Sequence, residues 1–411
     1  MSYKTELLEY VAEVAAGGGA PQGQDSFSEN GTPFVRAGSL PLLLKGAKEE
    51  SLELLTDEVA RNHRLRLFPK DTVLFAKSGM SATKGHIYQL KNPCYVVNHL
   101  AAIIPTEKIS GSFLKYWFQV FSPSRLIQDE AYPSIRLYDI KRLEIPLPPL
   151  PEQKRIAEVL DKADTLREKR RLALQKLDTL LQSVFLEMFG DPVKNPKGWK
   201  VSDLGEVCKF ISGSSLPEGD SFDNQIGGLL LVKVSDMNLV GNETFLNYTK
   251  LWKENFSNKN LICPKNSIVI PKRGGAIFTN KKRLLTRSAI LDPNTMAIVP
   301  NETKINPFYL FWWFQKFDLG SITSGSSVPQ LNKQDLSPLS IAVPPIKLQN
   351  EFHLATQTYL GTKHKMQIVL EHCESLFQSL QQRAFKGELF NDELSAVEPQ
   401  DEKVWQQTSL F

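Results

Sequence analysis

One stretch decides the organisation of this chain, and it reads Ile145-Pro146-Leu147-Pro148-Pro149-Leu150-Pro151-Glu152-Gln153. Consecutive prolines can continue neither a β-ladder nor the interior of a helix, so the secondary structure has to change type here. Pro151 and Glu152 suit the first turn of a helix, because proline has no amide hydrogen to leave unpaired and a carboxylate favours the positive end of the helix dipole. The stretch therefore predicts a mixed region of short strands before it and a long helix after it.

The same landmarks occur twice in the chain at a nearly constant offset. Pro148-Pro149 returns as Pro344-Pro345, 196 residues later (344 − 148), and Trp117-Phe118-Gln119 returns as Trp313-Phe314-Gln315 at the same offset (313 − 117). Two similar units imply two similar surfaces related by a pseudo-twofold axis. Such a protein most naturally meets a partner that also comes in two halves.

The bulk composition fits a soluble protein with more than one core. A chain of 411 residues is too long for a single core, so two globular domains are expected. No apolar run is long enough to cross a bilayer, and the first residues lack the apolar core of a signal peptide, which predicts a cytoplasmic protein. The four cysteines lie far apart, which indicates packing roles and neither a disulfide framework nor a zinc site. The net charge of +4 is small for this length, so any basic surface has to be confined to a part of the molecule.

Both long helices are predicted to carry a heptad seam. Sustained spacing of 3.5 residues makes a stripe that another helix must cover, so we expect the two helices to form a coiled coil, with antiparallel orientation as a preference that the connectivity does not prove. The alternative is that each seam packs on its own globular domain. The predicted seam positions are Ile156, Val159, Ala163, Leu166, Arg170, Ala173, Leu177, Leu180 and Val184 in the first helix, and Phe352, Ala355, Tyr359, Thr362, Met366, Val369, Cys373, Leu376 and Leu380 in the second.

These elements together predict a mixed α+β fold with an internal pseudo-twofold repeat. Two similar globular domains are joined by two long antiparallel helices that form a coiled coil. The predicted boundaries are 1–150 for the first globular domain, 151–190 for the first long helix, 191–346 for a linker and the second globular domain, 347–390 for the second long helix and 391–411 for a flexible tail.

The sequence offers little for catalysis. It has no G-x-x-x-x-G-K-[ST] phosphate loop, no G-x-G-x-x-G after a strand, no H-E-x-x-H and no N/D-P-P-F/Y segment of the amino-methyltransferase kind. The six histidines do not cluster by spacing, so a metal site is not predicted. We therefore expect a chain without catalytic residues, metal or cofactor of its own.

Basic, glycine-containing turns occur at equivalent places in the two units. Lys77-Ser78-Gly79 corresponds to Lys272-Arg273-Gly274-Gly275, and each follows a β-type run. Such a turn can present backbone amides and a cation to phosphate oxygens. The same pattern also fits a plain hairpin turn with a solvated lysine, and both interpretations stay open on the sequence.

Further cations extend these turns into a candidate DNA-binding set. Individually each is explained as a solubilising charge, but collectively they could line two grooves, and differences between the units are what two different base sequences would require. The candidates are Arg36, Lys77, Lys84 and Arg136 in the first unit, and Lys233, Lys272, Arg273, Lys281, Lys282 and Arg283 in the second.

This arrangement resembles the specificity subunit of type I restriction-modification systems. The resemblance rests on the basic strand-glycine turn, the short aromatic helix, the Ile145–Gln153 stretch and the long heptad helix ending in Leu180-Leu181-Gln182-Ser183-Val184-Phe185, all of them repeated over about residues 8 to 390. The second unit departs from the pattern, because Lys347-Leu348-Gln349 replaces Pro151-Glu152-Gln153 and keeps only the glutamine. That departure puts the start of the second helix in doubt.

The resemblance implies two target recognition domains that each read one half of a split double-stranded DNA sequence, with the two helices as a ruler between them. It also implies two methyltransferase subunits docked on the chain and restriction subunits with motor activity that join them. S-adenosylmethionine, ATP and magnesium would then belong to those partners. Two other functions fit the residues: a fused nuclease or methyltransferase with cryptic catalytic residues, and a coiled-coil adaptor that binds proteins.

Overall fold

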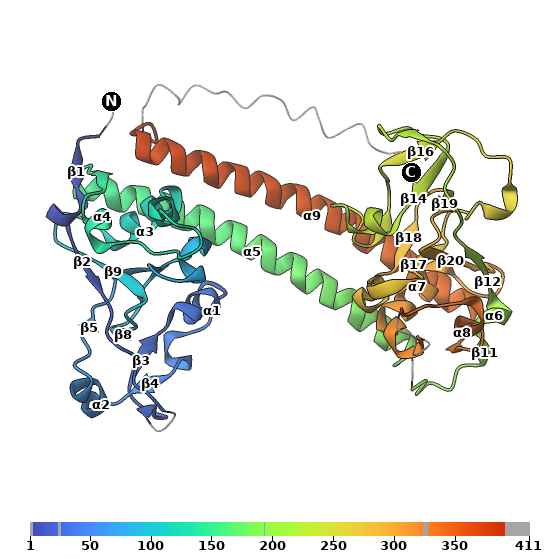
Figure 1. Cartoon of the computed structure of the whole chain (residues 1–411), viewed down its shortest axis with the longest axis horizontal. Helices are drawn as coiled ribbons and strands as arrows, with labels where there is room; N and C mark the ends of the chain where they lie inside the picture. The colour runs from blue at the N-terminus through green and yellow to red at the C-terminus, as the bar shows by residue number, and fades with distance from the viewer. Residues whose placement is uncertain (1–2, 24–25, 193, 324–327, 391–411) are drawn as a thin grey trace. The chain divides into compact units, whose positions relative to one another are not determined.

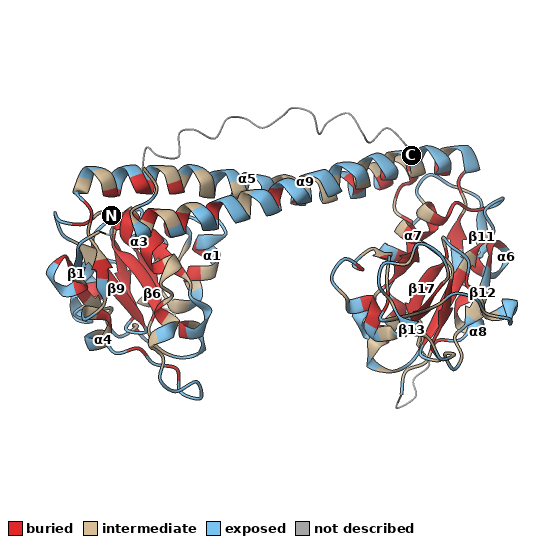
Figure 2. Ribbon diagram, turned by 90° about the horizontal axis from the view of Figure 1, so that it is seen from above, coloured by how far each residue is buried: buried red, intermediate tan, exposed pale blue. Residues whose placement is uncertain are grey.

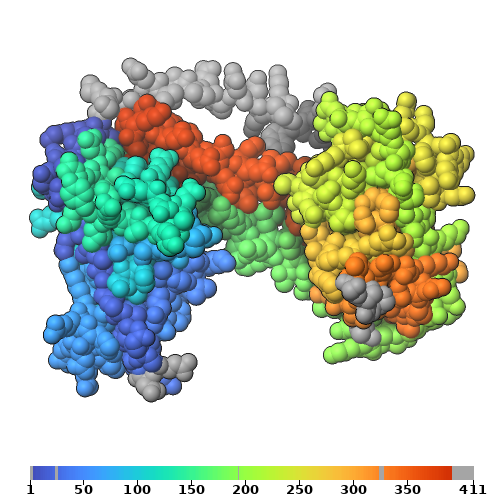
Figure 3. Space-filling model, in the orientation of Figure 1, coloured from blue at the N-terminus to red at the C-terminus, as the bar shows by residue number. Residues whose placement is uncertain are grey.

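The computed structural model describes residues 3–23, 26–192, 194–323 and 328–390. The predicted tail at 391–411 lies outside the described residues. Contacts divide the chain into two compact units, one with residues up to Arg171 and from Val369 onward, the other with Leu172–Ile368. Each unit thus contains one globular repeat and half of each long helix, whose courses can be followed in green and red in Figure 1. The space-filling view shows the residues of each repeat gathered in one body (Figure 3).

The first unit is built on an antiparallel sheet and a smaller mixed sheet. The antiparallel sheet has the order β2-β9-β6-β7, with strands Ala12–Ala16, Leu100–Pro105, Val73–Ala76 and Ile87–Gln89. The second has the order β4-β3-β8-β5, with strands Leu54–Leu55, Thr32–Val35, Cys94–Val96 and Leu67–Phe68, and β3 runs parallel to β8. A two-stranded ladder pairs β1 (Thr5–Leu7) with β10 (Glu144–Pro146).

The second unit repeats this frame. Its larger sheet has the order β12-β20-β17-β18-β15, with strands Cys208–Ser212, Thr295–Pro300, Ile268–Pro271, Arg283–Leu285 and Phe245–Leu246. Its smaller sheet has the order β13-β16-β14-β19, with strands Asp220–Ser221, Leu251–Lys253, Leu229–Val232 and Ala289–Leu291, and β14 runs parallel to β19. The ladder of β11 (Val201–Asp203) with β21 (Ser340–Ala342) matches that of β1 with β10.

Short helices complete each unit. The central strands β6 and β17 are buried along their whole length, and a short aromatic helix packs beside each sheet. The short helices are α1 (Leu40–Leu44), α2 (Asp57–Asn62), α3 (Gly111–Val120) and α4 (Leu137–Lys141) in the first unit, and α6 (Leu204–Val207), α7 (Pro307–Lys316) and α8 (Lys333–Leu336) in the second.

The two long helices begin directly after their prolines. Helix α5 spans Leu150–Phe189 with 40 residues, and α9 spans Ile346–Lys386 with 41. At 1.5 Å per residue each helix is about 60 Å long. In the part of the chain that the structure describes, no helix combines the length and the apolar character needed to cross a membrane.

A buried glutamine fastens the start of each long helix to its unit. The side chain of Gln153 is fully buried, its Nε2 donates to Pro148 O at 2.9 Å, and its Oε1 accepts from Ser110 N at 2.9 Å. Gln349 is equally buried, and it bonds Pro344 O at 2.6 Å and Asn306 N at 2.8 Å. The second helix therefore keeps the essential contact although it lacks the proline and glutamate of the first.

The two helices pack on each other in antiparallel orientation within each unit. In the first unit the guanidinium of Arg167 lies 4.1 Å from the centre of the Phe377 ring, and Arg171 pairs with Glu374 at 2.6 Å. In the second unit Phe185 packs edge-on against Phe352, with ring centres 5.4 Å apart. Also in the second unit, Lys363 pairs with Asp178 at 2.7 Å. Residue numbers rise on α5 while they fall on α9 in these contacts, which confirms the predicted antiparallel coiled coil.

At its alternate positions the predicted seam departs from the packed stripe, and five of these residues are exposed: Leu166, Leu180, Thr362, Val369 and Leu376. Counted from Ile156, the predicted seam moves forward by three residues and then by four. The packed stripe moves forward by four residues and then by three. Leu166, Leu180, Val369 and Leu376 are 42%, 57%, 40% and 53% exposed, and the residue after each is the one that turns inward. Val159 is half-buried beside the fully buried Leu160. The packed stripe includes Ile156, Leu160, Arg167, Leu174, Leu181 and Phe185 on α5, and Phe352, Thr356, Lys363, Leu370, Phe377 and Ala384 on α9.

The other heptad position of the prediction agrees with the packing except at Arg170, which is exposed. Figure 2 shows buried residues recurring among exposed ones along both helices. Neighbouring pairs such as Leu180-Leu181 place apolar residues on two adjacent stripes, so the sequence allows either one to be the seam, and the fit against the partner helix selects one. The predicted residues on the packed side are Ile156, Leu177, Val184, Phe352, Tyr359, Met366 and Leu380, each of them buried or half-buried.

Candidate nucleic-acid interface

In the first unit the basic turn is one half of a paired loop. Lys77 follows β6 directly, and its carbonyl oxygen accepts a hydrogen bond from Ile135 N at 2.7 Å. Gly79 N donates to Pro133 O at 2.9 Å, and Ser78 forms an antiparallel bridge with Ser134. We call residues 77–85 and 132–136 loop pair 1. Backbone bonds hold its two loops together, so the side chains of both project from a common edge.

The second unit contains the same construction. Leu331 N donates to Lys272 O at 2.9 Å, Gly274 N donates to Pro329 O at 2.9 Å, and Arg273 forms an antiparallel bridge with Gln330. We call residues 272–280 and 328–332 loop pair 2. Gly79 and Gly274 have φ angles of 71° and 69°, a conformation that a side chain would strain, and this explains the glycine in each turn.

Cations gather on both loop pairs. Lys77 and Lys272 are half-buried, and Lys272 Nζ lies 3.3 Å from Ser212 Oγ. Lys84, Arg136 and Arg273 are exposed and belong to the same loops. Five of the predicted DNA-contacting cations therefore share two equivalent edges of the molecule: Lys77, Lys84 and Arg136 in loop pair 1, and Lys272 and Arg273 in loop pair 2.

Arg36 and Lys233 occupy equivalent positions but have different surroundings. Each precedes a short 3₁₀-helix, Ala37–Ser39 and Val234–Asn238. The guanidinium of Arg36 pairs with Glu53 at 2.5 Å and lies 5.3 Å from the centres of two phenylalanine rings. Lys233 is exposed; its backbone amide donates to Asp236 Oδ2 at 2.8 Å, and its carbonyl oxygen accepts from Asp236 N at 2.9 Å. The charge of Arg36 is thus balanced locally, whereas that of Lys233 is directed to solvent.

Lys282 and Arg283 do not face solvent, which corrects their assignment to DNA contact. Lys282 Nζ donates to Phe317 O and to Asn280 Oδ1, both at 2.7 Å, and Arg283 donates to Met237 O at 2.9 Å. The two residues are 1% and 9% exposed, and burial lowers the pKa of Lys282 to about 8. Their donors are used inside the unit, so phosphate cannot replace these partners without unpacking β18. Neighbouring Lys281 is half-buried and bonds Asn238.

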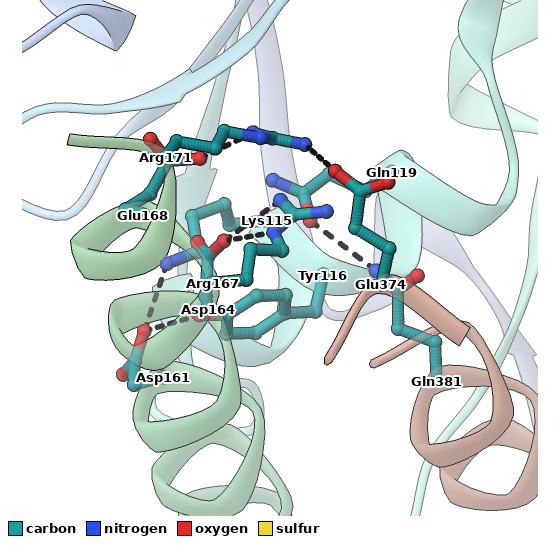
Figure 4. Close-up of polar contacts among 10 residues, drawn as sticks. All are labelled: Lys115, Tyr116, Gln119, Asp161, Asp164, Arg167, Glu168, Arg171, Glu374 and Gln381. Carbon is teal, nitrogen blue, oxygen red and sulfur yellow. Dashed lines mark hydrogen bonds and ion pairs between the residues drawn. The ribbon is translucent and has the colours of Figure 1, made fainter. Parts of the chain in front are cut away.

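A polar network fixes the helix pair against α3 in the first unit (Figure 4). Asp161 accepts from Lys115 Nζ at 2.9 Å and from the Tyr116 hydroxyl at 2.5 Å, and burial together with this carboxylate raises the pKa of Tyr116. Arg171 bridges Glu168 on α5 and Glu374 on α9, and Gln381 Nε2 lies 3.3 Å from Gln119 Oε1. Every side chain in the network has a partner within the unit, which indicates positioning and not chemistry.

The described residues contain no candidate metal centre. No group of three or more His, Cys, Asp or Glu residues is placed to hold a metal ion within residues 3–23, 26–192, 194–323 and 328–390. Cys94, Cys208 and Cys263 are buried, as a packing role requires, and burial raises the pKa of Cys208 and Cys263 to about 12. Their thiols are therefore protonated at neutral pH.

The sequence prediction named Arg136 but did not recognise that a second loop pairs with the basic turn in each unit. Tyr132-Pro133-Ser134-Ile135 and Val328-Pro329-Gln330-Leu331 lie 196 residues apart (329 − 133), which is the same offset that revealed the repeat. The signal in the sequence that could have revealed this loop is a proline followed two residues later by an aliphatic residue, at the same offset in both units. Ile135 and Leu331 are 1% and 0% exposed, and they anchor the loops to the cores.

Comparison with known proteins identifies the family. The model of the type I restriction modification DNA specificity domain matches residues 3–176 and 196–362, which are the two repeats. The chain belongs to this family and contains its domain twice, which confirms the resemblance seen in the residues.

Curated relatives cover most of the chain. The type I restriction enzyme MjaIX specificity subunit of Methanocaldococcus jannaschii is 25% identical over 331 residues, which are 74% of this chain and 74% of the relative. The putative type I restriction enzyme specificity subunit S.HindORF215P of Haemophilus influenzae is 23% identical over 289 residues, which are 68% of this chain and 72% of the relative. Type I specificity subunits are thus similar to this chain over both repeats.

Two solved structures share its fold. The S subunit of a type I restriction-modification system from M. genitalium superposes with a TM-score of 0.58 at 14% identity, over 94% of this chain and 96% of the other. A chain from a study of complex assembly and conformational transition of the type I R-M system gives a TM-score of 0.55 at 17% identity, over 94% and 98% of the two chains. The fold expected from the resemblance, two similar domains with long connecting helices, is confirmed.

Proposed function

We propose that this chain reads a split double-stranded DNA sequence for a type I restriction-modification complex, with one repeat for each half-site. The observation that carries the proposal is the recurrence of one construction in both units, a loop pair with the same backbone bonds and a cluster of cations. Membership of the DNA specificity family supports the same conclusion. Two equivalent frames with different side chains suit two half-sites of different sequence.

The exposed or half-buried cations of the loop pairs are proposed to contact phosphates. Phosphate contacts fix the register of a protein on DNA and supply most of the salt-dependent affinity. Lys77, Lys84 and Arg136 would serve the first half-site, and Lys233, Lys272 and Arg273 the second. Arg36 and Lys281 already bond side chains of their own unit, so we assign them a smaller contribution to phosphate binding.

The helices are proposed to set the spacing between the half-sites. Helices α5 and α9 each continue without a break from one unit into the other. A helix lengthens by about 1.5 Å per residue, and the separation of half-sites follows the geometry of the protein that reads them. Lengthening both helices by one heptad should therefore lengthen the unread gap by about three base pairs.

The exposed apolar residues of the helices are proposed to bind partner subunits. Leu166, Leu180, Val369 and Leu376 lie outside the packed stripe and remain 40% to 57% exposed. Large apolar residues that stay exposed can mark a surface that a partner covers. We infer that two methyltransferase subunits dock there and that restriction subunits join them. S-adenosylmethionine, ATP and magnesium would be bound by those partners, and the whole complex would act on DNA in the cytoplasm.

A footprint of the assembled complex tests this function. The complex on DNA that carries its target should protect two separate blocks with an unprotected gap. A single continuous block would contradict the assignment of one repeat to each half-site. Methyl transfer or DNA cleavage by this chain alone would overturn its non-catalytic role and favour a fused enzyme. Absence of DNA binding at low salt with all partners present would favour a protein adaptor.

A further inference from the structure

The two loop pairs have matching backbones but different outward side chains. Buried Ile135 and Leu331 correspond, as do the prolines two residues before them, so the loops are anchored in the same way. The exposed and half-buried positions diverge in size, charge and hydrogen-bonding capacity. Ser78, Met80, Tyr132 and Ser134 in loop pair 1 correspond to Arg273, Gly275, Val328 and Gln330 in loop pair 2.

Large side chains stand out from loop pair 1. Met80 is 65% exposed and Tyr132 is 82% exposed, whereas the side chains that anchor the same loops are buried. Ser78 is not available in the same way, because its hydroxyl lies 2.7 Å from His99 Nδ1. Loop pair 1 thus presents Met80, Tyr132 and Ser134. A methionine and a tyrosine offer apolar surface, which suits the methyl group of thymine.

Loop pair 2 presents hydrogen-bonding groups at the corresponding place. Arg273 and Gln330 form an antiparallel bridge, and residues opposite one another in such a bridge project to the same side of the ladder. An arginine donates two parallel hydrogen bonds to guanine, and a glutamine can both donate to and accept from adenine. Two neighbouring side chains of these types can therefore read two purines in one groove.

Loop pair 1 follows the end of its central strand that points away from the start of the long helix. Asp71, just before β6, lines a surface pocket together with Ser110 and with Lys154 of α5, so the start of β6 is near the long helix. Lys77 and loop pair 1 follow the other end of the same strand. Loop pair 1 therefore lies at the end of β6 opposite to the start of α5, and its own ladder holds its backbone.

We propose that these divergent side chains are the base-reading residues of the chain, which deepens the proposed function and rests on it. Arg273 reads a guanine and Gln330 an adenine in the second half-site. Met80 and Tyr132 read a thymine-containing step in the first half-site, with Ser134 as an adjacent hydrogen-bonding group. The shared cations hold the duplex, and the divergent residues select its sequence.

Selection from random duplex DNA tests the assignment. The complete complex with its methyltransferase partners is incubated with a duplex pool randomised over both half-sites, and the methylated molecules are sequenced. Arg273→Ala and Gln330→Ala should each relax the choice of base at one position of the second half-site by about 10- to 100-fold, with the first half-site unchanged. Met80→Ala together with Tyr132→Ala should relax the first half-site and leave the second unchanged.

Lys272→Ala provides the matched control, because Lys272 is the neighbour of Arg273 and is assigned to phosphate. This variant should weaken binding evenly over all sequences. If Arg273→Ala and Gln330→Ala behave in the same even way and both half-sites keep their sequence, base reading by these residues is overturned while the proposed function stands. If the wild-type complex selects no sequence at all, the proposed function fails and the assignment fails with it.

Discussion

The two repeats share a frame and differ in what the frame carries. In both, four antiparallel strands (β2-β9-β6-β7 and β12-β20-β17-β18), a parallel strand pair in the smaller sheet and a long helix held by a buried glutamine recur. Between the first strand of the parallel pair and the central strand, both repeats have two short strands, β4 and β5 in the first and β15 and β16 in the second, but only the first adds the α-helices α1 and α2. The elements that fix the long helices are thus common to both repeats, and those farther along the sheets are free to diverge.

The comparison also separates two kinds of polar residue. Gln153 and Gln349 bond equivalent backbone groups, because the start of each long helix has to be fixed to its unit in the same way. Lys282 has no counterpart of its type, because the equivalent position in the first unit, 195 residues earlier as Lys77 is to Lys272, is Ile87. Residues that repeat in type and contact therefore belong to the frame, and residues that differ need an explanation specific to one unit.

The largest expected effect concerns the helix seam. Leu181→Asp places a carboxylate at a side chain that is 3% exposed and should lower the free energy of unfolding by about 4 kcal/mol. Leu180→Asp, one residue away and 57% exposed, should change it by less than about 0.5 kcal/mol. Urea denaturation of both variants checks the difference. Phe377→Asp and Leu376→Asp form the equivalent pair in the first unit, and equal effects within either pair would refute the observed seam.

Replacement of the buried glutamine at the start of either long helix should lower the stability of its repeat, and to a similar extent in both repeats. Gln153→Ala and Gln349→Ala each leave buried backbone groups without a partner, at a cost of about 2–3 kcal/mol. Lys154 is exposed and follows Gln153 directly, so Lys154→Ala is the control and should leave the stability nearly unchanged. Hydrogen exchange at the start of α5 and α9 resolves the two sites separately. A large loss in one unit with none in the other would show that the frame is not equivalent in the two repeats.

A pH effect is expected for the second unit alone. Burial lowers the pKa of Lys282 to about 8 in the folded chain, from 10.5 in the unfolded chain. Between these values the unfolded chain binds more protons, so the free energy of unfolding contributed by this lysine rises with pH, by about 2 kcal/mol from pH 7.5 to 9.5. The measurement is the difference in stability between wild type and Lys282→Met at several pH values. A constant difference would mean that this ammonium is not penalised by burial.

The smallest expected effect concerns DNA binding by the lysines at the two ends of each central strand. Lys77→Ala and Lys272→Ala should each weaken DNA binding of the complex by about 1 kcal/mol and reduce the slope of log affinity against log salt by about 1. Lys70→Ala and Lys265→Ala, at the other end of β6 and β17, should leave both quantities unchanged. Titrations at several salt concentrations provide the values. Equal losses for the two sets of variants would remove the loop pairs from the phosphate contact.

The sequence by itself determined the repeat, the place where each long helix begins and the pairing of the two helices. These features depend on periodic or punctuating residues, since prolines, heptads and a constant offset leave a local signal. The basic turn after β6 and β17 was visible for the same reason, because a glycine at positive φ and a flanking lysine are encoded within a few residues.

Only the tertiary structure decided which of two adjacent apolar stripes forms the seam and which cations reach solvent. Leu180 and Leu181 are equally apolar in the sequence, and the facing helix determines which of them is buried. Lys281, Lys282 and Arg283 form one basic run in the sequence, yet carbonyl oxygens of Phe317 and Met237, distant along the chain, bind two of them inside the unit. Burial and hydrogen bonding depend on residues far apart in sequence, so no local pattern could have settled either question.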